Sequence, residues 1–188
     1  MARNDDSRTA VHIRKAMRKD WPAVALLLAE LGRPDIRLSP DGDVAGRQIF
    51  ERYLRRRDAV ALVAEQAGRI LGFVDMEYRS WLNFKAPQAW IPDMIVAEGA
   101  RGRGIGGALL SHAEELARSR NCWSMALESA NWREAAHEFY RAQGWTLTAS
   151  HFTKSLTDVD WPPAPGTSSG ATSSGKASSR SSGAESAR

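Results

Sequence analysis

The sequence is almost without cysteine, since Cys122 is the only one among 188 residues. A single cysteine cannot form a disulfide within the chain and cannot build a zinc site from paired thiolates, and we predict no metal site. Long apolar runs are also missing: the run over residues 22–29 stops at Glu30, far short of the roughly 18 residues that span a bilayer. The polar N-terminal residues carry no apolar region of a secretory signal. These absences predict a cytoplasmic protein without a membrane partner.

Large apolar residues are absent from the last part of the chain. Residues 164–188 include nine Ser, five Ala, four Gly and two Thr. Burial of such side chains cannot offset the entropy lost on ordering them, and Pro162 and Pro163 just before them remove backbone donors. We therefore expect a single domain at residues 9–157, a disordered N-terminus at 1–8, and a proline linker with a disordered Ser/Gly/Ala-rich tail at 158–188.

The chain does contain enough apolar residues, 43%, to bury the core of one ordinary domain. Its net charge of +4 favours anionic partners without separating nucleic acid from a phosphorylated cofactor. Four arginines, Arg52, Arg55, Arg56 and Arg57, lie on the outer face of a predicted helix at 44–57. This pattern is open to nucleic-acid binding, but solvation of an amphipathic helix is the favoured interpretation, so nucleic acid is disfavoured as a partner.

Hydrophobic periodicity predicts a mixed α/β chain. Residues 60–66 and 70–78 are β-rich runs joined by Ala67-Gly68-Arg69, which predicts an antiparallel hairpin. Pro92 interrupts the next predicted strand and indicates a bulge. The predicted strands are 11–14, 60–66, 70–78, 89–96, 124–128, 145–147 and 151–156, and the predicted helices are 20–32, 44–57, one that begins after Gly107, and 134–142.

A glycine-rich loop joins the fourth predicted strand to the third predicted helix. Gly102, Gly104, Gly106 and Gly107 let an anion approach the backbone, where amide groups and the positive end of the helix dipole converge. A Walker loop is excluded because no lysine or hydroxyl follows the glycines. A Rossmann loop is disfavoured because this loop lies mid-chain after an antiparallel hairpin. The loop therefore predicts a phosphate site of another kind.

The residues around this loop resemble the GNAT superfamily of acetyl-CoA-dependent N-acetyltransferases. The resemblance rests on Arg101-x-x-Gly104-x-Gly106 after a strand, on Glu128 at the next strand, and on Tyr140-x-x-x-Gly144-Trp145. It covers residues 11–156 and implies a mixed seven-stranded sheet, splayed between its fourth and fifth strands, with about four helices. It is most similar to the branch that acts on small-molecule amines.

The resemblance also implies a set of contacts to acetyl-CoA. The strand before the loop would pair through its backbone with the pantetheine arm, and the loop amides would hold the pyrophosphate. Family members often place an asparagine seven residues before the motif tyrosine, where this chain has Arg133 with Asn131 two residues earlier. The implied contacts are Met94, Ile95 and Val96 on the strand, Arg101, Gly102, Arg103, Gly104, Ile105, Gly106 and Gly107 in the loop, and Asn131 and Arg133 beyond it.

Three catalytic residues follow from the resemblance and from the needs of the reaction. Tyr140 matches the family tyrosine that gives a proton to the leaving thiolate, although a core aromatic is its structural alternative. The attacking amine must be neutral, so a group must take up its proton. Asp93, set among apolar residues that should raise its pKa above about 3.9, is favoured as this base over Glu128. Each of the two is otherwise a structural carboxylate.

We therefore expect an enzyme that moves an acetyl group from acetyl-CoA to a primary amine of a small molecule by direct attack. Trp81, Phe84 and Trp90 near Asp93 are expected to form an aromatic, acidic pocket for a cationic amine. His137, one turn before Tyr140, is expected to pack or orient, with a proton relay as its second role. The alternatives are acetylation of a peptide N-terminus or lysine, and a regulator that binds CoA or nucleic acid without turnover. A homodimer is left open.

Overall fold

The computed structural model describes residues 10–32, 44–154 and 156. Up to Lys154 the chain forms one compact unit, and of the second unit, Ser155–Arg188, only Leu156 is described. The predicted disordered ends at 1–8 and 158–188 lie outside the described residues, so the domain boundaries stay predictions. No described helix combines the length and apolar character that a bilayer crossing needs.

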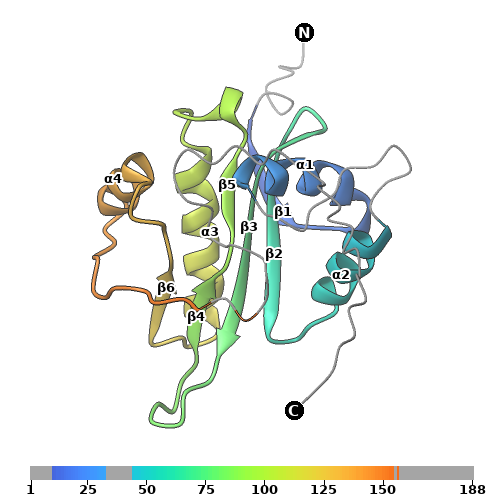
Figure 1. The fold of residues 1–188 in the computed structure, drawn as a ribbon. Coiled ribbons are helices and arrows are strands. Elements are labelled where there is room, and N and C mark those ends of the chain that lie inside the picture. The colour runs from blue at the N-terminus through green and yellow to red at the C-terminus, as the bar shows by residue number, and fades with distance from the viewer. Residues whose placement is uncertain (1–9, 33–43, 155, 157–188) are drawn as a thin grey trace, which may run out of the picture. The chain divides into compact units, whose positions relative to one another are not determined.

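The described residues form a six-stranded, mostly antiparallel sheet with helices on both faces (Figure 1). The sheet order is β1-β2-β3-β4-β6, and β5 pairs with β3. The mixed α/β class and the four α-helices are as predicted. The strands are β1 (His12–Lys15), β2 (Ala59–Gln66), β3 (Arg69–Arg79), β4 (Gln88–Ile91), β5 (Met94–Val96) and β6 (Ser124–Leu127), and the helices are α1 (Trp21–Leu31), α2 (Val44–Leu54), α3 (Ile105–Ser119) and α4 (Glu134–Ala142).

Successive side chains of the central strands point to opposite faces of the sheet, and this produces two apolar cores, one on each face. Ala61 and Val63 of β2 point to the face covered by α1 and α2, where Trp21 and Phe50 pack. Leu62 of β2 and its neighbours on that side point to α3, whose apolar residues complete the other core. This period-two arrangement fixes the register of the sheet, because a slip of one residue would exchange the two faces.

A bulge divides the predicted fourth strand into β4 and β5. The register pairs Glu77 with Trp90 and Val74 with Met94, so two residues of β3 face three residues of the other strand. The Asp93 amide donates a hydrogen bond of 2.8 Å to the Asp75 carboxylate, which supports the extra residue. The bulge expected at Pro92 is therefore confirmed, and it separates β4 from β5, which both pair antiparallel with β3.

The predicted opening of the sheet lies beside this bulge. β4 and β6 are parallel and pair only from Gln88 with Ser124 to Ile91 with Leu127. Past that point β5 pairs with β3 alone among the described strands. The sheet therefore opens between β5 and the end of β6, where the splay was expected.

The prediction of seven strands is wrong for the described residues, because residues 145–147 and 151–154 form no strand. Apart from Trp145, which packs against the core, their large apolar side chains gain little burial, with Leu147 74% and Phe152 92% exposed. Without a buried face, alternation of apolar and polar residues does not stabilise a strand. The second helix also ends earlier than predicted, at Leu54, because residues 55–58 turn into β2.

Candidate functional site

The glycine loop forms an open helix N-terminus. Gly102 and Gly104 have φ values of +73° and +78°, and a Cβ atom added at either would meet nothing within 4 Å. Gly104 is the N-cap of α3, and no side chain caps the first turn of this helix. The buried side chain of Ile105 anchors the helix to the core. The first amides of α3 therefore have no side-chain cap and can take an anion, and phosphate binding at this loop stays a prediction.

The two loop arginines are occupied by acceptors of the protein itself. Arg101 donates hydrogen bonds to the Val96 carbonyl at 3.1 Å and to Glu30 at 2.9 Å, so it ties the loop to β5 and to α1. Arg103 donates to the Gln66 side chain at 2.6 Å. These hydrogen bonds hold the loop in place, and the cofactor contacts expected of both arginines stay predictions.

The β5 edge beside the opening offers backbone groups for pairing. Hydrogen bonds from the Ala97 amide to the Leu71 carbonyl and from the Asp75 amide to the Asp93 carbonyl fix the phase of the β3–β5 ladder. In this phase the Ile95 backbone faces β3, while the backbone groups of Met94 and the Val96 amide face the opening, and the Val96 carbonyl accepts the hydrogen bond of Arg101. Of the three predicted backbone contacts, Met94 and Val96 are thus well placed, and Ile95 contributes a buried side chain instead.

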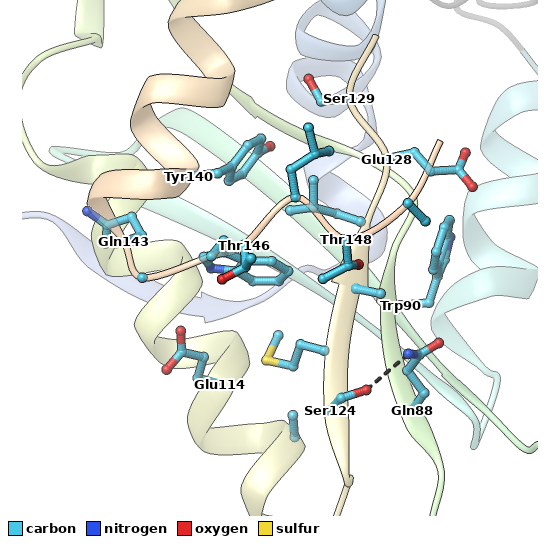
Figure 2. Close-up of a pocket in the computed structure, with 18 of the residues that line it drawn as sticks. Gln88, Trp90, Glu114, Ser124, Glu128, Ser129, Tyr140, Gln143, Thr146 and Thr148 are labelled. Atoms are coloured by element: carbon cyan, nitrogen blue, oxygen red, sulfur yellow. Dashed lines mark hydrogen bonds between the residues drawn. The ribbon is translucent and has the colours of Figure 1, made fainter. Parts of the chain in front are cut away.

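A cleft of about 880 Å³ lies between β4, β6, α3, α4 and the segment after α4. Figure 2 shows Tyr140 on one side of this cleft and Glu128 and Trp90 on the other, with Thr146 and Thr148 between them. His137 also lines the cleft. Residues from distant parts of the sequence therefore share one solvent-accessible space.

Tyr140 is held in this cleft by aromatic packing. Its ring centroid lies 5.3 Å from that of Phe139 and 6.1 Å from that of Trp145. Burial raises the pKa of the Tyr140 phenol, and the nearby Arg133 charge offsets only part of this effect. The phenol therefore keeps its proton at neutral pH and can donate it.

Gly106 allows α4 to approach the start of α3. A Cβ atom at this position would lie 3.1 Å from the Phe139 ring and 3.4 Å from the Met94 side chain. The phosphate loop, the β5 edge and the tyrosine helix therefore meet at this glycine. The prediction gave Gly106 a role in cofactor contact and missed this packing role, which no local pattern reveals.

The two predicted carboxylates lie in different places. Glu128 is exposed, lines the cleft and pairs with His151 at 2.5 Å. Asp93 is half-buried in the bulge and is not part of the cleft lining in the described ranges. The structure therefore brings Glu128, and not Asp93, into the same cleft as Tyr140. His151 was expected only as part of a strand. Its ion pair with Glu128 joins residues that are distant in the sequence, so a local sequence pattern could not predict it.

Two of the three rings expected to form an aromatic pocket around Asp93 have partners within the protein. Phe84 stacks on Trp123 at 4.3 Å, at the end of the β3–β4 hairpin. The Arg79 guanidinium covers the Trp90 ring at 4.2 Å. A ring stack and a cation–π contact thus already engage these two rings, and the amine pocket stays a prediction.

The two predicted contacts before α4 also differ. Asn131 is exposed in the loop after β6. Arg133 donates a hydrogen bond of 2.9 Å to the Leu31 carbonyl at the end of α1 and stacks on Trp132 at 4.8 Å. It therefore links the start of α4 to the end of α1, and its expected contact with the cofactor stays a prediction.

Other reactive groups can be placed as well. Cys122 is half-buried outside any disulfide, and burial raises the pKa of its thiol. Within the described part of the chain, no group of three or more His, Cys, Asp or Glu side chains lies close enough to hold a metal ion.

Known proteins with similar sequences and folds complete the assignment. Aminoalkylphosphonate N-acetyltransferase of Salmonella typhimurium is 26% identical over 83% of this chain and 98% of its own length. Aminoglycoside N(6')-acetyltransferase type 1 of Klebsiella aerogenes is 29% identical over 60% of this chain and 78% of its own. A solved structure described as a transcriptional regulator from Bacillus halodurans has a TM-score of 0.74 at 25% identity, covering 78% of this chain and 100% of that one. Residues 21–145 match the Acetyltransferase (GNAT) family, and the chain belongs to it.

Proposed function

We propose that this acyltransferase moves the acetyl group of acetyl-CoA to a primary amine of a small molecule by direct attack. The observation that carries the proposal is the meeting of three parts at Gly106: an open phosphate loop, a strand edge with outward backbone groups, and a half-buried tyrosine on α4. Members of the GNAT family use acetyl-CoA, and these three parts fit its pyrophosphate, its amide-bearing arm and its leaving thiolate.

Each part has a role in this proposal. The amides of residues 102–107 hold the pyrophosphate at the positive end of α3. The backbone groups of Met94 and Val96 pair with the pantetheine arm as an added strand would. Tyr140 gives its proton to the departing sulfur, which its raised pKa favours by keeping the phenol protonated. Asp93 and Glu128 are the two carboxylates that can assist removal of a proton from the amine.

A small-molecule acceptor is supported by the relatives and by the cleft. The relatives named above are called aminoalkylphosphonate and aminoglycoside acetyltransferases, and both names denote small amines. The segment at 145–151 forms a wall of the cleft next to Tyr140. A peptide acceptor would need an open groove, so this wall favours a compact amine.

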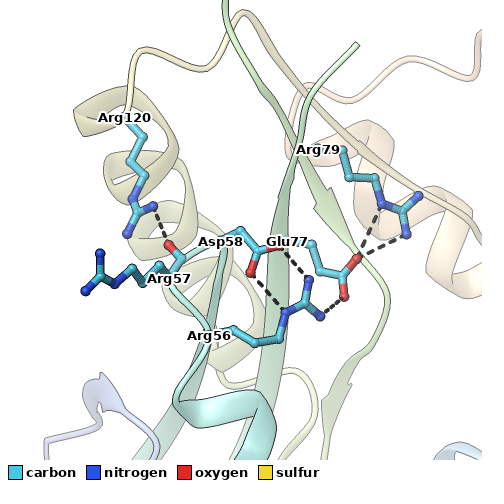
Figure 3. Close-up of polar contacts among 6 residues, drawn as sticks. All are labelled: Arg56, Arg57, Asp58, Glu77, Arg79 and Arg120. Carbon is cyan, nitrogen blue, oxygen red and sulfur yellow. Dashed lines mark hydrogen bonds and ion pairs between the residues drawn. The ribbon is translucent and has the colours of Figure 1, made fainter.

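Regulation is a second candidate, because the Bacillus halodurans neighbour is described as a transcriptional regulator. The arginine cluster that would serve nucleic-acid binding is partly neutralised, as Figure 3 shows: Arg56 pairs with Asp58 at 2.9 Å and with Glu77 at 2.6 Å. Arg120 covers the Tyr78 ring at 4.3 Å and donates to the Arg57 carbonyl. Salt-sensitive binding of DNA or RNA without acetyl-CoA binding would favour the regulator.

Thiol release measured across a panel of primary amines tests the proposal. The panel includes aminoalkylphosphonates and aminoglycosides. We expect release of CoA that depends on acetyl-CoA and on one class of amine in the panel. Release that is equal with and without every amine would contradict it.

A further inference from the structure

The cleft holds an ion pair between Glu128 and His151, and the roles above do not use its histidine. Glu128 comes directly after β6, and His151 lies on the segment after α4, so the fold alone brings them together. The Nδ1 atom of His151 is 2.5 Å from Glu128 Oε1, and both residues line the cleft that contains Tyr140. The two side chains are 50% and 41% exposed, so substrate and water can reach them.

The pairing determines which nitrogen of the imidazole can react. When Nδ1–H donates to a carboxylate, Nε2 keeps its lone pair and can accept a proton. The carboxylate also stabilises the imidazolium that forms, as the acidic member of a catalytic triad does for its histidine. Glu128 and His151 therefore have the arrangement of a general base and its supporting carboxylate.

We propose that His151 accepts the proton of the acceptor amine and that Glu128 is the positioning residue that holds it; this inference rests on the proposed function. An N–H bond of the ammonium breaks, and its proton joins Nε2 of His151. The freed lone pair then bonds to the acetyl carbon while the carbon–sulfur bond breaks, and the thiolate takes the Tyr140 proton. The acetylated nitrogen then loses its second proton, which water carries to the Tyr140 phenolate, and His151 releases the first proton to water.

Two other residues are poorer candidates for this base. Asp93 lies in the bulge with its amide held by Asp75, outside the lining of the cleft. His137 does line the cleft, one turn before Tyr140. Among the described side chains, however, an ion pair with a carboxylate is present for His151 and not for His137. Its place in the cleft and its ion pair with Glu128 therefore favour His151 as the base.

The test compares His151→Gln with His112→Gln as a matched control. His112 lies on α3 outside the cleft, 3.8 Å from Glu115, so it is also an exposed histidine beside a carboxylate. The measurement is kcat/KM for an amine that the wild type acetylates, followed from mildly acidic to alkaline pH, with acetyl-CoA affinity from calorimetry. The charged and titratable groups that share the cleft with His151 are Glu114, Arg118, Cys122, Glu128, His137, Tyr140 and Arg141.

We expect His151→Gln to lower kcat/KM about 10²-fold or more at neutral pH, the usual effect of losing a general base. The deficit should shrink as rising pH supplies neutral amine from solution, and the acetyl-CoA dissociation constant should stay unchanged. His151→Ala should regain rate when imidazole is added, which a merely structural residue would not show. Glu128→Gln in the His151→Gln background should add no further loss, because Glu128 acts through His151.

Equal pH profiles for His151→Gln and His112→Gln, or full additivity of the Glu128 and His151 substitutions, would overturn the base assignment while acetyl transfer itself stands. A wild-type protein that binds acetyl-CoA but acetylates no amine would overturn the proposed function, and this inference with it. The two failures are distinguished by the wild-type rate alone.

Discussion

At the scale of single residues, burial sets the protonation state of Tyr140, the proposed general acid. A phenol whose pKa is raised holds its proton at neutral pH, so Tyr140 is present in the form that can donate to the leaving sulfur. The aromatic neighbours Phe139 and Trp145 hold the ring on either side. Removal of the hydroxyl should therefore change proton transfer and leave the packing intact.

Tyr140→Phe should lower turnover on the order of 10²-fold, because only the acidic proton is lost. The dissociation constant for acetyl-CoA should not change. Steady-state kinetics and calorimetry on the same preparation check both parts. Unchanged turnover would show that Tyr140 is only a packing residue.

Asp20 shows how one carboxylate links stability to pH. Its side chain is 5% exposed and accepts hydrogen bonds from both terminal nitrogens of Arg14, at 2.7 and 2.9 Å, and from the Met17 amide. Burial alone would raise the pKa of Asp20, but these hydrogen bonds outweigh it and lower the pKa below its usual 3.8. A pKa that is lower in the folded protein contributes stability above the unfolded value, and that stability is lost as the pH falls through the folded pKa.

We expect Asp20→Asn to lower the free energy of unfolding at neutral pH by about 2 kcal/mol, the size of charged hydrogen bonds in a buried setting. The difference from the wild type should shrink toward strongly acidic pH, where Asp20 is itself protonated. Denaturant unfolding across this pH range measures it. Asp58→Asn is the control: it removes an exposed carboxylate paired with Arg56 and should cause no measurable change. A constant difference at all pH values would contradict the account.

At the scale of elements, helices and hairpins were predictable because their signals are local. The period of apolar residues gave α1, and Gly32 with φ of +87° ends it as expected. The predicted bulge at Pro92 is also present, because a proline in a strand removes a ladder donor. The strands expected after α4 are missing from residues 145–154, because strand formation there depends on a partner and a buried face that spacing does not report.

The candidate site likewise has parts that short motifs predict and parts that depend on long-range contacts. The glycine loop and Tyr140 were identified from short motifs, and the structure places them close together through Gly106. The partners of Arg101, Arg103 and Arg133 are Glu30, Gln66 and the Leu31 carbonyl. Each of these contacts joins distant parts of the chain, so the sequence could not show that the three guanidinium groups were already engaged.

Gly104→Val should weaken acetyl-CoA binding at least tenfold, about 1.4 kcal/mol. The cause is backbone conformation, since φ is +78° and the space around the position is open, whereas a β-branched residue strongly disfavours positive φ. Calorimetric titration with acetyl-CoA measures the effect. Gly99→Ala is the matched control, because Gly99 lies near the same loop without positive φ and with open space around it. Equal affinity of both variants would show that this loop does not bind the cofactor.

At the scale of the whole molecule, two apolar cores hold the sheet from both faces while its strands part beyond Ile91 and Leu127. α1 and α3 pack on β5 from opposite sides. The opening is therefore bordered by well-packed elements, which keeps the β5 edge in place for backbone pairing.

Removal of residues 164–188, which lie outside the described residues, should leave the melting temperature and the turnover nearly unchanged. This expectation rests on their composition, because no large apolar side chain there can join a core. Thermal unfolding and steady-state rates of the shortened and full chains provide the comparison. A loss of several degrees would mean that the tail contributes to the folded domain.

The most direct test of the central claim follows the acetyl group itself. The full-length protein is incubated with isotopically labelled acetyl-CoA and an accepted primary amine, and mass spectrometry then locates the label. Direct transfer predicts one labelled acetyl group on the nitrogen of the product for each CoA released, with none on the protein at Cys122. CoA release without labelled amine, or label that accumulates on the protein before product forms, would contradict direct acetyl transfer.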